Sequence, residues 1–110
     1  MKPLEGLKIV TVEHFAAGPY GSMLLADLGA TVIKVENVKT GGDPARRLGP
    51  HFLGDNDSLV FQGWNTCKQS LALDLKDPDD RRAFESVVRT ADAVMNNLRG
   101  DQPGRIGLDY

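Results

Sequence analysis

The chain has 110 residues, of which 41% are hydrophobic and 25% are charged, so it is long enough for one soluble domain and too short for two. Its 13 basic and 15 acidic residues give a net charge of -2 and are spread along the chain, which excludes the basic patches that bind nucleic acid or membrane surfaces. A single cysteine, Cys67, excludes an internal disulfide, and the sequence shows neither the apolar stretch of a signal peptide nor an apolar run of membrane-spanning length. We therefore predict a cytoplasmic protein.

Residues 1–36 predict a strand, a helix and a second strand. Lys8–Glu13 is a short apolar run rich in β-branched residues, which is typical of a buried strand. Gly18-Pro19 opens a helix over Tyr20–Leu28, and Gly29 stands where a helix end favours a left-handed residue. Thr31–Glu36 is the second strand. This order predicts a βαβ unit with two parallel strands and a right-handed crossover.

Residues 37–57 form a stretch rich in glycine and proline, which we interpret as a long ordered loop that is functional or covers a partner. Leu59–Trp64 predicts a short helix, and Ser70–Leu75 predicts a third strand.

The last part of the chain predicts a second crossover. Asp77 caps a helix over Pro78–Thr90, with acidic groups at its positive end. Ala93–Asn96 is a short fourth strand, and a loop then leads to a last helical turn after Pro103-Gly104-Arg105.

The order of elements predicts an α/β fold, an open parallel sheet with Rossmann-like βαβ units. Such sheets bind ligands outside the carboxyl ends of their strands. Here those ends are Phe15–Gly18, Glu36–Asn37, Asp74–Lys76 and Asn96–Arg99. Because no closing helices follow, we expect residues 1–110 to be the N-terminal part of a larger fold.

Short motifs lie along the chain in an order that is typical of one enzyme family. The longest are Pro3–Val10 (PLEGLKIV) and Leu25–Glu36 (LADLGATVIKVE), which follows Ala17-Gly18-Pro19. Shorter matches in the same order and spacing are Gly42-Asp43, Asn65, Lys68, Ser70, Leu73–Lys76, Ala91-Asp92, Asn97 and Arg105–Leu108. Each motif is weak alone, but the ordered set covers essentially the whole chain. It resembles the class III CoA-transferases, the group of formyl-CoA transferase and carnitine-CoA transferase.

The resemblance implies that residues 1–110 are the CoA-binding part of an interlocked homodimer. Members of the family use acyl-CoA and a carboxylic acid, and they move CoA between acids through an acyl-aspartyl intermediate. The family's catalytic aspartate lies downstream of the region that matches here, so no aspartate of this chain is expected to take its role, and we expect the segment alone to be inactive. Relatives with the same opening are acyl-CoA racemases.

The resemblance also implies which residues contact coenzyme A. One stretch lies along the adenine and ribose, at Leu73, Asp74, Leu75 and Lys76. The residues after the fourth strand approach the pantetheine and phosphate region, at Asn97, Leu98 and Arg99. A further phosphate contact falls on Arg105. The loop that approaches the thioester is Phe15, Ala16 and Ala17.

Two positions depart from the family pattern. Ala16 stands where oxalate-specific formyl-CoA transferases have a glutamine, which argues against that substrate. Asn37 replaces a common CoA-contacting arginine, and no basic residue follows until Lys39.

Some candidate residues also have simpler interpretations. Without the resemblance, Arg105 is an exposed arginine after a Pro-Gly turn and Lys76 a solvated lysine before a helix. Gly18 and Gly21 imitate a phosphate-binding loop, but the dinucleotide fingerprint is absent and Pro19 lacks an amide hydrogen. We therefore expect Gly18 to allow close approach of another element.

The remaining reactive side chains show no catalytic or metal-binding spacing. A lone cysteine such as Cys67 is most often a small buried hydrophobe. His14 has no partner fixed by spacing, His51 is expected on the surface, and the two histidines predict no metal site. The aspartates are expected to be caps and turn anchors, at Asp27, Asp43, Asp74 and Asp92.

The leading hypothesis is therefore the CoA-binding part of an acyl-CoA transferase. An acyl-CoA racemase and a non-catalytic CoA- or nucleotide-binding module are the alternatives.

Overall fold

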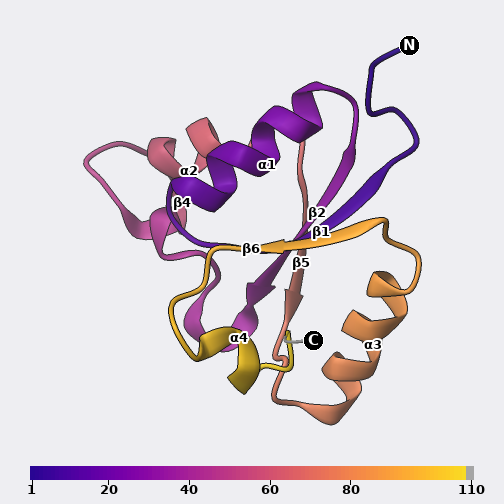
Figure 1. Cartoon of the computed structure of the whole chain (residues 1–110). Coiled ribbons are helices and arrows are strands. Elements are labelled where there is room, and N and C mark those ends of the chain that lie inside the picture. Colours follow the sequence, from indigo (N-terminus) through magenta and orange to yellow (C-terminus); the bar gives the residue numbers. More distant parts are fainter. Residues whose placement is uncertain (109–110) are drawn as a thin grey trace.

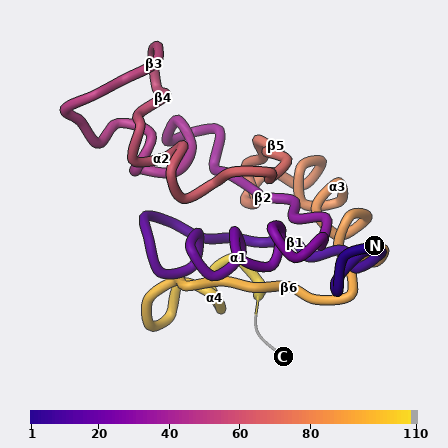
Figure 2. Tube along the Cα trace, turned by 90° about the horizontal axis from the view of Figure 1, so that it is seen from above, coloured from indigo at the N-terminus to yellow at the C-terminus, as the bar shows by residue number. Residues whose placement is uncertain are grey.

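Four parallel strands form the central sheet of the computed structural model, which describes residues 1–108. They are β1 (Lys8–Val12), β2 (Thr31–Asn37), β5 (Gln69–Leu73) and β6 (Ala93–Asn96), in the spatial order β5-β2-β1-β6. All three pairings are parallel, and Figure 2 shows the strands side by side in this order. The predicted α/β class and all four strands are confirmed, with ends shifted by at most two residues.

The two crossover helices lie on opposite faces of the sheet (Figure 1). The helix α1 (Ala17–Asp27) joins β1 to β2, whereas α3 (Pro78–Val88) joins β5 back across the sheet to β6. These connections run in opposite directions, so right-handed crossovers place their helices on different faces. The result is a three-layered, doubly wound arrangement.

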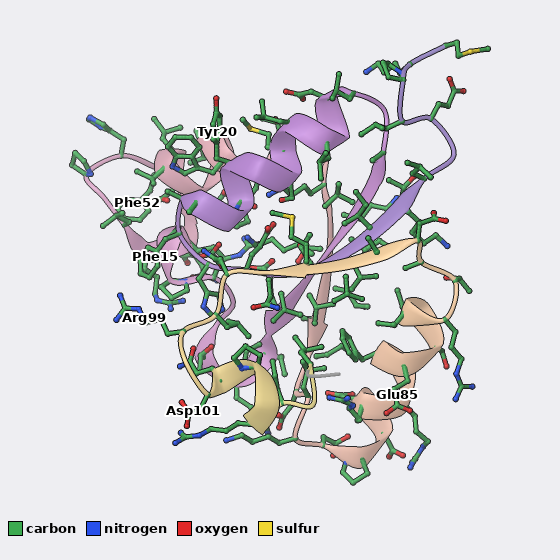
Figure 3. The ribbon with its side chains drawn as sticks, viewed as in Figure 1. Phe15, Tyr20, Phe52, Glu85, Arg99 and Asp101 are labelled. Carbon is green, nitrogen blue, oxygen red and sulfur yellow. The ribbon has the colours of Figure 1, made fainter. Side chains whose placement is uncertain are left out.

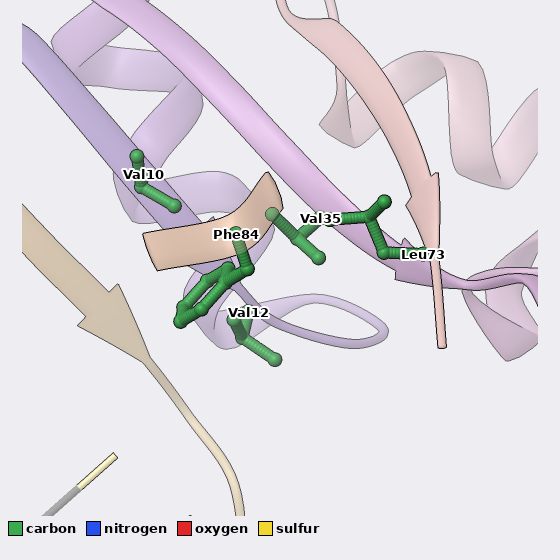
Figure 4. Packing of buried hydrophobic residues seen from close by; sticks show 5 residues of the cluster. All are labelled: Val10, Val12, Val35, Leu73 and Phe84. Atoms are coloured by element: carbon green, nitrogen blue, oxygen red, sulfur yellow. The ribbon is translucent and has the colours of Figure 1, made fainter. Parts of the chain in front are cut away.

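The face under α3 is apolar. Val10 and Val12 of β1 and Val35 of β2 pack with Leu73 and with Phe84 of α3, whose side chain is only 2% exposed (Figure 4). Residues two apart on a strand share a face, which explains why the valines of β1 point the same way. This cluster fastens α3 to the sheet.

The face under α1 changes character along the strands. At their amino ends, Ile9 and Val32 pack with Ala26 and Ala30. Two and four residues further on, the same face of β1 carries Thr11 and Glu13, and β2 carries Lys34 and Glu36, all buried. Polar groups in the interior need partners, so the carboxyl half of this face must hold a network of hydrogen bonds.

The segment after β2 is more ordered than the sequence indicated, so its interpretation as a long loop was incomplete. It contains two 3-10 helices, η1 (Val38–Thr40) and η2 (Pro44–Arg47), and a hairpin of β3 (Phe52–Gly54) and β4 (Asp57–Ser58), before α2 (Leu59–Trp64). The carboxylate of Asp43 accepts from the Ala45 N–H and Pro44 follows, which starts η2. Asn56 adopts the left-handed backbone of the hairpin corner.

Helix ends also differ by a few residues. α1 begins at Ala17 rather than Tyr20 and ends at Asp27, and Gly29 has the predicted left-handed backbone, with a φ of 107°. The Asp77 cap of α3 is confirmed, because its carboxylate accepts from the N–H groups of Asp79 and Asp80. The last helix is α4 (Gln102–Arg105). None of the helices in residues 1–108 is long and apolar enough to cross a membrane.

Candidate functional site

The carboxyl ends of β1 and β6 meet where the strand order reverses. The crossover from β1 runs to β2 on one side of it, whereas β6, on its other side, is reached by the crossover from β5. In open α/β sheets, this switch point is where ligands bind. The Phe15–Ala17 loop follows β1 and Asn97 follows β6, so the fold brings together two groups of residues that the sequence predicted to contact CoA.

The side chain of Asn97 clamps the backbone of His14. Its Oδ1 accepts from the His14 N–H at 2.9 Å, and its Nδ2 donates to the His14 carbonyl at 3.0 Å. Gly18 makes room for this contact, because a Cβ there would lie 2.8 Å from Asn97 Cγ and 2.9 Å from Glu13 Cβ. The predicted close approach at Gly18 is therefore confirmed, and its partner is a loop residue of the site.

Phe15 has a left-handed backbone, with a φ of 62°, and its side chain is exposed. A non-glycine residue adopts this conformation only when its surroundings hold it there. The Phe15 N–H donates to Asp43 Oδ1 at 3.1 Å, across 28 residues of sequence. Ala16 and Ala17 follow, both exposed, at the start of α1.

The predicted adenine and ribose residues lie at the carboxyl end of β5. Leu73 is only 7% exposed and belongs to the cluster under α3, so its side chain is not available to a ligand. Leu75 and Leu98 pack against the same cluster. Asp74 Oδ1 accepts from the Lys76 N–H at 3.0 Å, and the Lys76 side chain is exposed. The contacts of these residues with CoA remain predictions.

The two predicted arginines are exposed at the same edge. Figure 3 shows Phe15, Arg99 and Asp101 on one side of the molecule. Arg105 in α4 is 74% exposed at its side chain and pairs with Asp101 at 2.7 Å. Arg81 of α3 fixes the end of α4 by donating to the carbonyls of Ile106 and Gly107. The backbone of Arg105 is therefore in a helix whose end is fixed by Arg81, whereas the Arg105 side chain extends into solvent.

A buried charge network beneath the Phe15 loop was not predicted. Lys34 Nζ lies 2.7 Å from Asp43 Oδ2 and 3.9 Å from Glu13 Oε1, and all three side chains are at most 1% exposed. Lys68 Nζ donates to Glu13 Oε1 at 2.9 Å and to the Pro19 carbonyl at 2.8 Å. Charged residues at alternate positions of strands expected to be buried indicate that such a network exists. The sequence does not show which residues pair with them, because the partners come from distant segments.

Asn65 links the two lysines of this network. Its Oδ1 accepts from Lys34 Nζ at 3.0 Å and from Lys68 Nζ at 2.9 Å. Burial lowers the pKa of Lys68 more than its bond to Glu13 raises it. Glu13 Oε2 and Thr11 Oγ1, both buried, have no hydrogen-bond partner among the described residues.

A partly buried ion pair extends the network toward the hairpin. Arg46 donates to both carboxylate oxygens of Glu36, at 2.8 and 2.7 Å, and its guanidinium lies 3.8 Å from the Phe61 ring centre. Burial alone would raise the pKa of Glu36. Hydrogen bonds from Arg46, the Asp43 N–H and Ser70 outweigh burial and lower that pKa to about 2. Glu36 is therefore ionised at neutral pH and fixes the segment that follows β2.

Three other expectations concern reactive or metal-binding groups. Cys67 was expected to be buried and is exposed, because it lies in a turn before β5 with a φ of 63°; the expectation was wrong. His51 is exposed, as predicted. Within residues 1–108, no group of three or more His, Cys, Asp or Glu side chains is arranged to hold a metal ion.

The exposed groups at the carboxyl edge fit the phosphates of coenzyme A in charge. Lys76, Arg99 and Arg105 supply cations, which bind phosphate oxygens well. At the end of β2, the Asn37 side chain accepts from the Lys39 N–H at 2.9 Å, and the exposed Lys39 is a fourth cation. Hollows of 440 Å³ beside α2 and 610 Å³ beside α3 include none of these four cations. All four lie on the exposed surface of the chain.

Comparison with known proteins agrees with this geometry. Residues 4–110 match the profile of CoA-transferase family III. The chain is 41% identical to succinate–glutarate CoA-transferase of Agrobacterium fabrum and 41% identical to acetyl-CoA:oxalate CoA-transferase of Acetobacter aceti; each match covers 98% of the chain but only 28% and 27% of those proteins. A crystal structure of a CAIB/BAIF family protein from Brucella suis superimposes with a TM-score of 0.88 at 36% identity, over 99% of the chain and 29% of that protein. The chain thus spans less than a third of the length of these relatives, and it belongs to CoA-transferase family III.

Proposed function

We propose that this chain is the CoA-binding part of an enzyme that transfers coenzyme A between carboxylic acids. The observation that carries the proposal is the Phe15 loop, clamped by Asn97 at the switch point of the sheet, with exposed cations along the same edge. Family membership and the transferase names of the relatives support it.

Different residues of the site bind different parts of the CoA molecule. Lys76 and Arg105 bind the charged nucleotide end, because ammonium and guanidinium groups form charge-assisted bonds to phosphate oxygens. Leu73–Leu75 offers backbone groups and a partly apolar rim to the adenine and ribose. Asn97–Arg99 lines the path of the pantetheine, and Phe15–Ala17 meets the thioester.

The chemistry that we propose for the whole protein is nucleophilic. An aspartate outside this chain attacks the thioester carbonyl, and the carbon–sulfur bond breaks to give a mixed anhydride and the CoA thiolate. The thiolate then attacks the aspartyl carbonyl of the anhydride, which releases the first acid as a carboxylate and leaves an aspartyl-CoA thioester. The carboxylate of the second acid attacks this thioester to form a second anhydride and free the thiolate, and attack of the thiolate on the carbonyl of the second acid gives the new acyl-CoA and releases the aspartate. Covalent catalysis of this kind splits one hard exchange into easier steps. Residues 1–110 bind and orient CoA, and the working unit is a cytoplasmic homodimer.

Small dicarboxylic acids are the substrates to test first. The names of the relatives specify succinate with glutarate, oxalate, and, for a protein of Haloarcula hispanica with 43% identity, mesaconate. Ala16 argues against oxalate as the acid accepted here.

The experiment is a transfer assay on the full-length protein. Succinyl-CoA is mixed with glutarate, mesaconate or oxalate, and new thioesters are separated by chromatography. Formation of a second acyl-CoA, with no loss of total thioester, is the expected result. Inversion of a chiral acyl-CoA without an acceptor acid would identify a racemase instead, and calorimetric binding of CoA without either reaction would identify a binding module.

A further inference from the structure

The segment after β2 reaches back to the loop after β1 through one buried carboxylate. We infer that Asp43 is a positioning residue, which holds the Phe15 turn in the conformation that presents it to the acyl end of CoA. The inference rests on the proposed function, since it assigns a task to the Phe15 turn. The family resemblance includes Gly42-Asp43 but gives that aspartate no role.

Asp43 is fully buried and every polar atom of its carboxylate is used. Oδ1 accepts from the Phe15 N–H at 3.1 Å and from the Ala45 N–H at 2.9 Å. Oδ2 accepts from Lys34 Nζ at 2.7 Å, and the Asp43 N–H donates to Glu36 Oε1 at 2.9 Å. The carboxylate therefore links β2, η2 and the Phe15 turn at one point.

The Phe15 turn needs such a link. Its left-handed backbone is unfavourable for a residue with a Cβ, and half of its surface is exposed rather than packed in the core. Two anchors hold the turn from outside. The Asn97 amide fixes His14, and the Asp43 carboxylate fixes Phe15.

An ionised carboxylate suits this position better than a neutral amide. Both of its oxygens accept, so it can serve two N–H groups on one side and the Lys34 ammonium on the other. In Asp43→Asn, one side of the amide donates. With its nitrogen facing Lys34, the amide keeps its oxygen toward Phe15, but the Lys34 ammonium loses its acceptor and repels the amide donor. Rotated by 180°, the amide serves Lys34, but its nitrogen meets the Phe15 and Ala45 N–H groups. The anchor is therefore weakened in the first orientation and lost in the second.

Removing the lysine charge should restore the anchor. In Asp43→Asn combined with Lys34→Met, the amide nitrogen can face the uncharged side chain, so Oδ1 again accepts from Phe15. Ser58→Ala is the matched control, because Ser58 is buried in the same segment, donates to the Ala45 carbonyl and accepts from the Phe61 N–H, and makes no hydrogen bond with Phe15. It removes two buried hydrogen bonds and leaves the bond between Asp43 and Phe15 in place.

The first measurement needs no variant. Hydrogen exchange of the full-length wild-type protein is resolved to the Phe15 amide. Although Phe15 is exposed, its amide should exchange at least about 100-fold more slowly than in an unstructured peptide, because the Asp43 bond must open first. Exchange at the unstructured rate would overturn the inference, whether or not the protein transfers CoA.

The second measurement separates positioning from folding. The transfer rate is divided by the concentration of CoA-binding sites, which calorimetry gives, so that unfolded protein does not lower the rate per site. Asp43→Asn should lower the rate per site by about tenfold or more and leave the Kd of free CoA within about threefold, since the nucleotide end binds elsewhere. The double variant should recover most of the rate, and Ser58→Ala should keep it.

Each outcome has a distinct meaning. An unchanged rate per site in Asp43→Asn, an equal loss in Ser58→Ala, or no recovery in the double variant would overturn the role of Asp43. A wild-type protein that binds no CoA and transfers none would instead refute the proposed function, and the exchange rate of the Phe15 amide would still decide whether the anchor exists.

Discussion

Arg105 provides the sharpest test of the CoA site. The side chain is 74% exposed and its partner in the structure is Asp101, at 2.7 Å. If Arg105 binds a phosphate of CoA, it must exchange this exposed pair for a charge-assisted bond to the ligand. The gain is about 1.5–3 kcal/mol for such a bond, less the roughly 0–1 kcal/mol that an exposed ion pair is typically worth, so the net gain in binding free energy is about 0.5–3 kcal/mol.

Arg105→Ala should therefore weaken CoA binding by about 2- to 150-fold. Arg105→Lys should recover only part of the loss, because a point charge does not reproduce the planar fork of the guanidinium. Asp101→Asn should instead raise the affinity for CoA, by up to about fivefold, because the Asp101 carboxylate no longer competes with the phosphate for Arg105. Arg89→Ala is the control for net charge, since Arg89 follows α3 at the opposite edge of the sheet.

The assay is calorimetric titration of the full-length protein with CoA and with dephospho-CoA. If the 3′-phosphate is the contact, the loss in Arg105→Ala should shrink for dephospho-CoA; if it is the diphosphate, the loss should be the same for both ligands. Raising the salt concentration toward 1 M should reduce all these differences, because the contact is exposed and therefore screened. Equal CoA affinity of wild type and Arg105→Ala would remove Arg105 from the site.

Four further predictions concern the fold, the loop and the chain as a whole. Phe84→Ala should lower the free energy of unfolding by about 3–5 kcal/mol, measured by urea titration, because the side chain is 2% exposed; a loss below about 1 kcal/mol would contradict the packing. Gly18→Ala should cost about 1–3 kcal/mol and speed exchange of the His14 amide, since the new Cβ would lie 2.8 Å from Asn97 Cγ; an unchanged exchange rate would contradict that contact. The pKa of Glu36 is lowered to about 2, so its contribution to stability is fully present above the unfolded value of about 4.3 and is lost as the pH falls from there toward 2. After allowance for solvent screening this contribution is on the order of 2 kcal/mol, and acid unfolding curves of wild type and Glu36→Gln should converge by that amount over this pH range; parallel curves would refute it. The 110-residue chain alone should not turn over a CoA thioester beyond its rate of hydrolysis in buffer, because the proposed nucleophile lies elsewhere; measured transfer would show that a group of this chain is catalytic.

The sheet could be predicted because its signal is local. The runs of β1 and β2 alternate between residues that face α3 and residues that face α1, and glycine or proline marks each turn between them. The Asp77 cap is equally local, since its partners lie two and three residues away. The ion pair of Asp101 and Arg105 has a helical i, i+4 spacing, so the sequence could have revealed it too.

The interior of the site could not be predicted in this way. Lys34 is flanked by apolar residues in a predicted strand, and alternation assigns it to a face, but nothing near it in sequence shows that Asp43, Glu13 and Asn65 surround it. The order of residues 38–58 depends on the same long-range bonds, which is why a stretch rich in glycine and proline resembled a loop. Turn geometry overrode the usual burial of cysteine at Cys67.

The two faces of the sheet divide the work of holding the fold and shaping the site. Apolar contacts under α3 are strong but non-directional, so they fasten the layers without fixing individual N–H groups. The network under α1 sets three acids, Glu13, Glu36 and Asp43, against three bases, Lys34, Arg46 and Lys68, and is neutral as a whole. Because desolvation offsets most of the attraction in buried ion pairs, such a network stabilises the fold less than its number of charges suggests. Its hydrogen bonds are directional, however, and they end on the backbone of Phe15, Ala45 and Pro19. Charged residues therefore occupy the α1 face at the carboxyl ends of the strands, where the positions of loop atoms matter for a ligand. Apolar residues occupy the α3 face, where only packing matters.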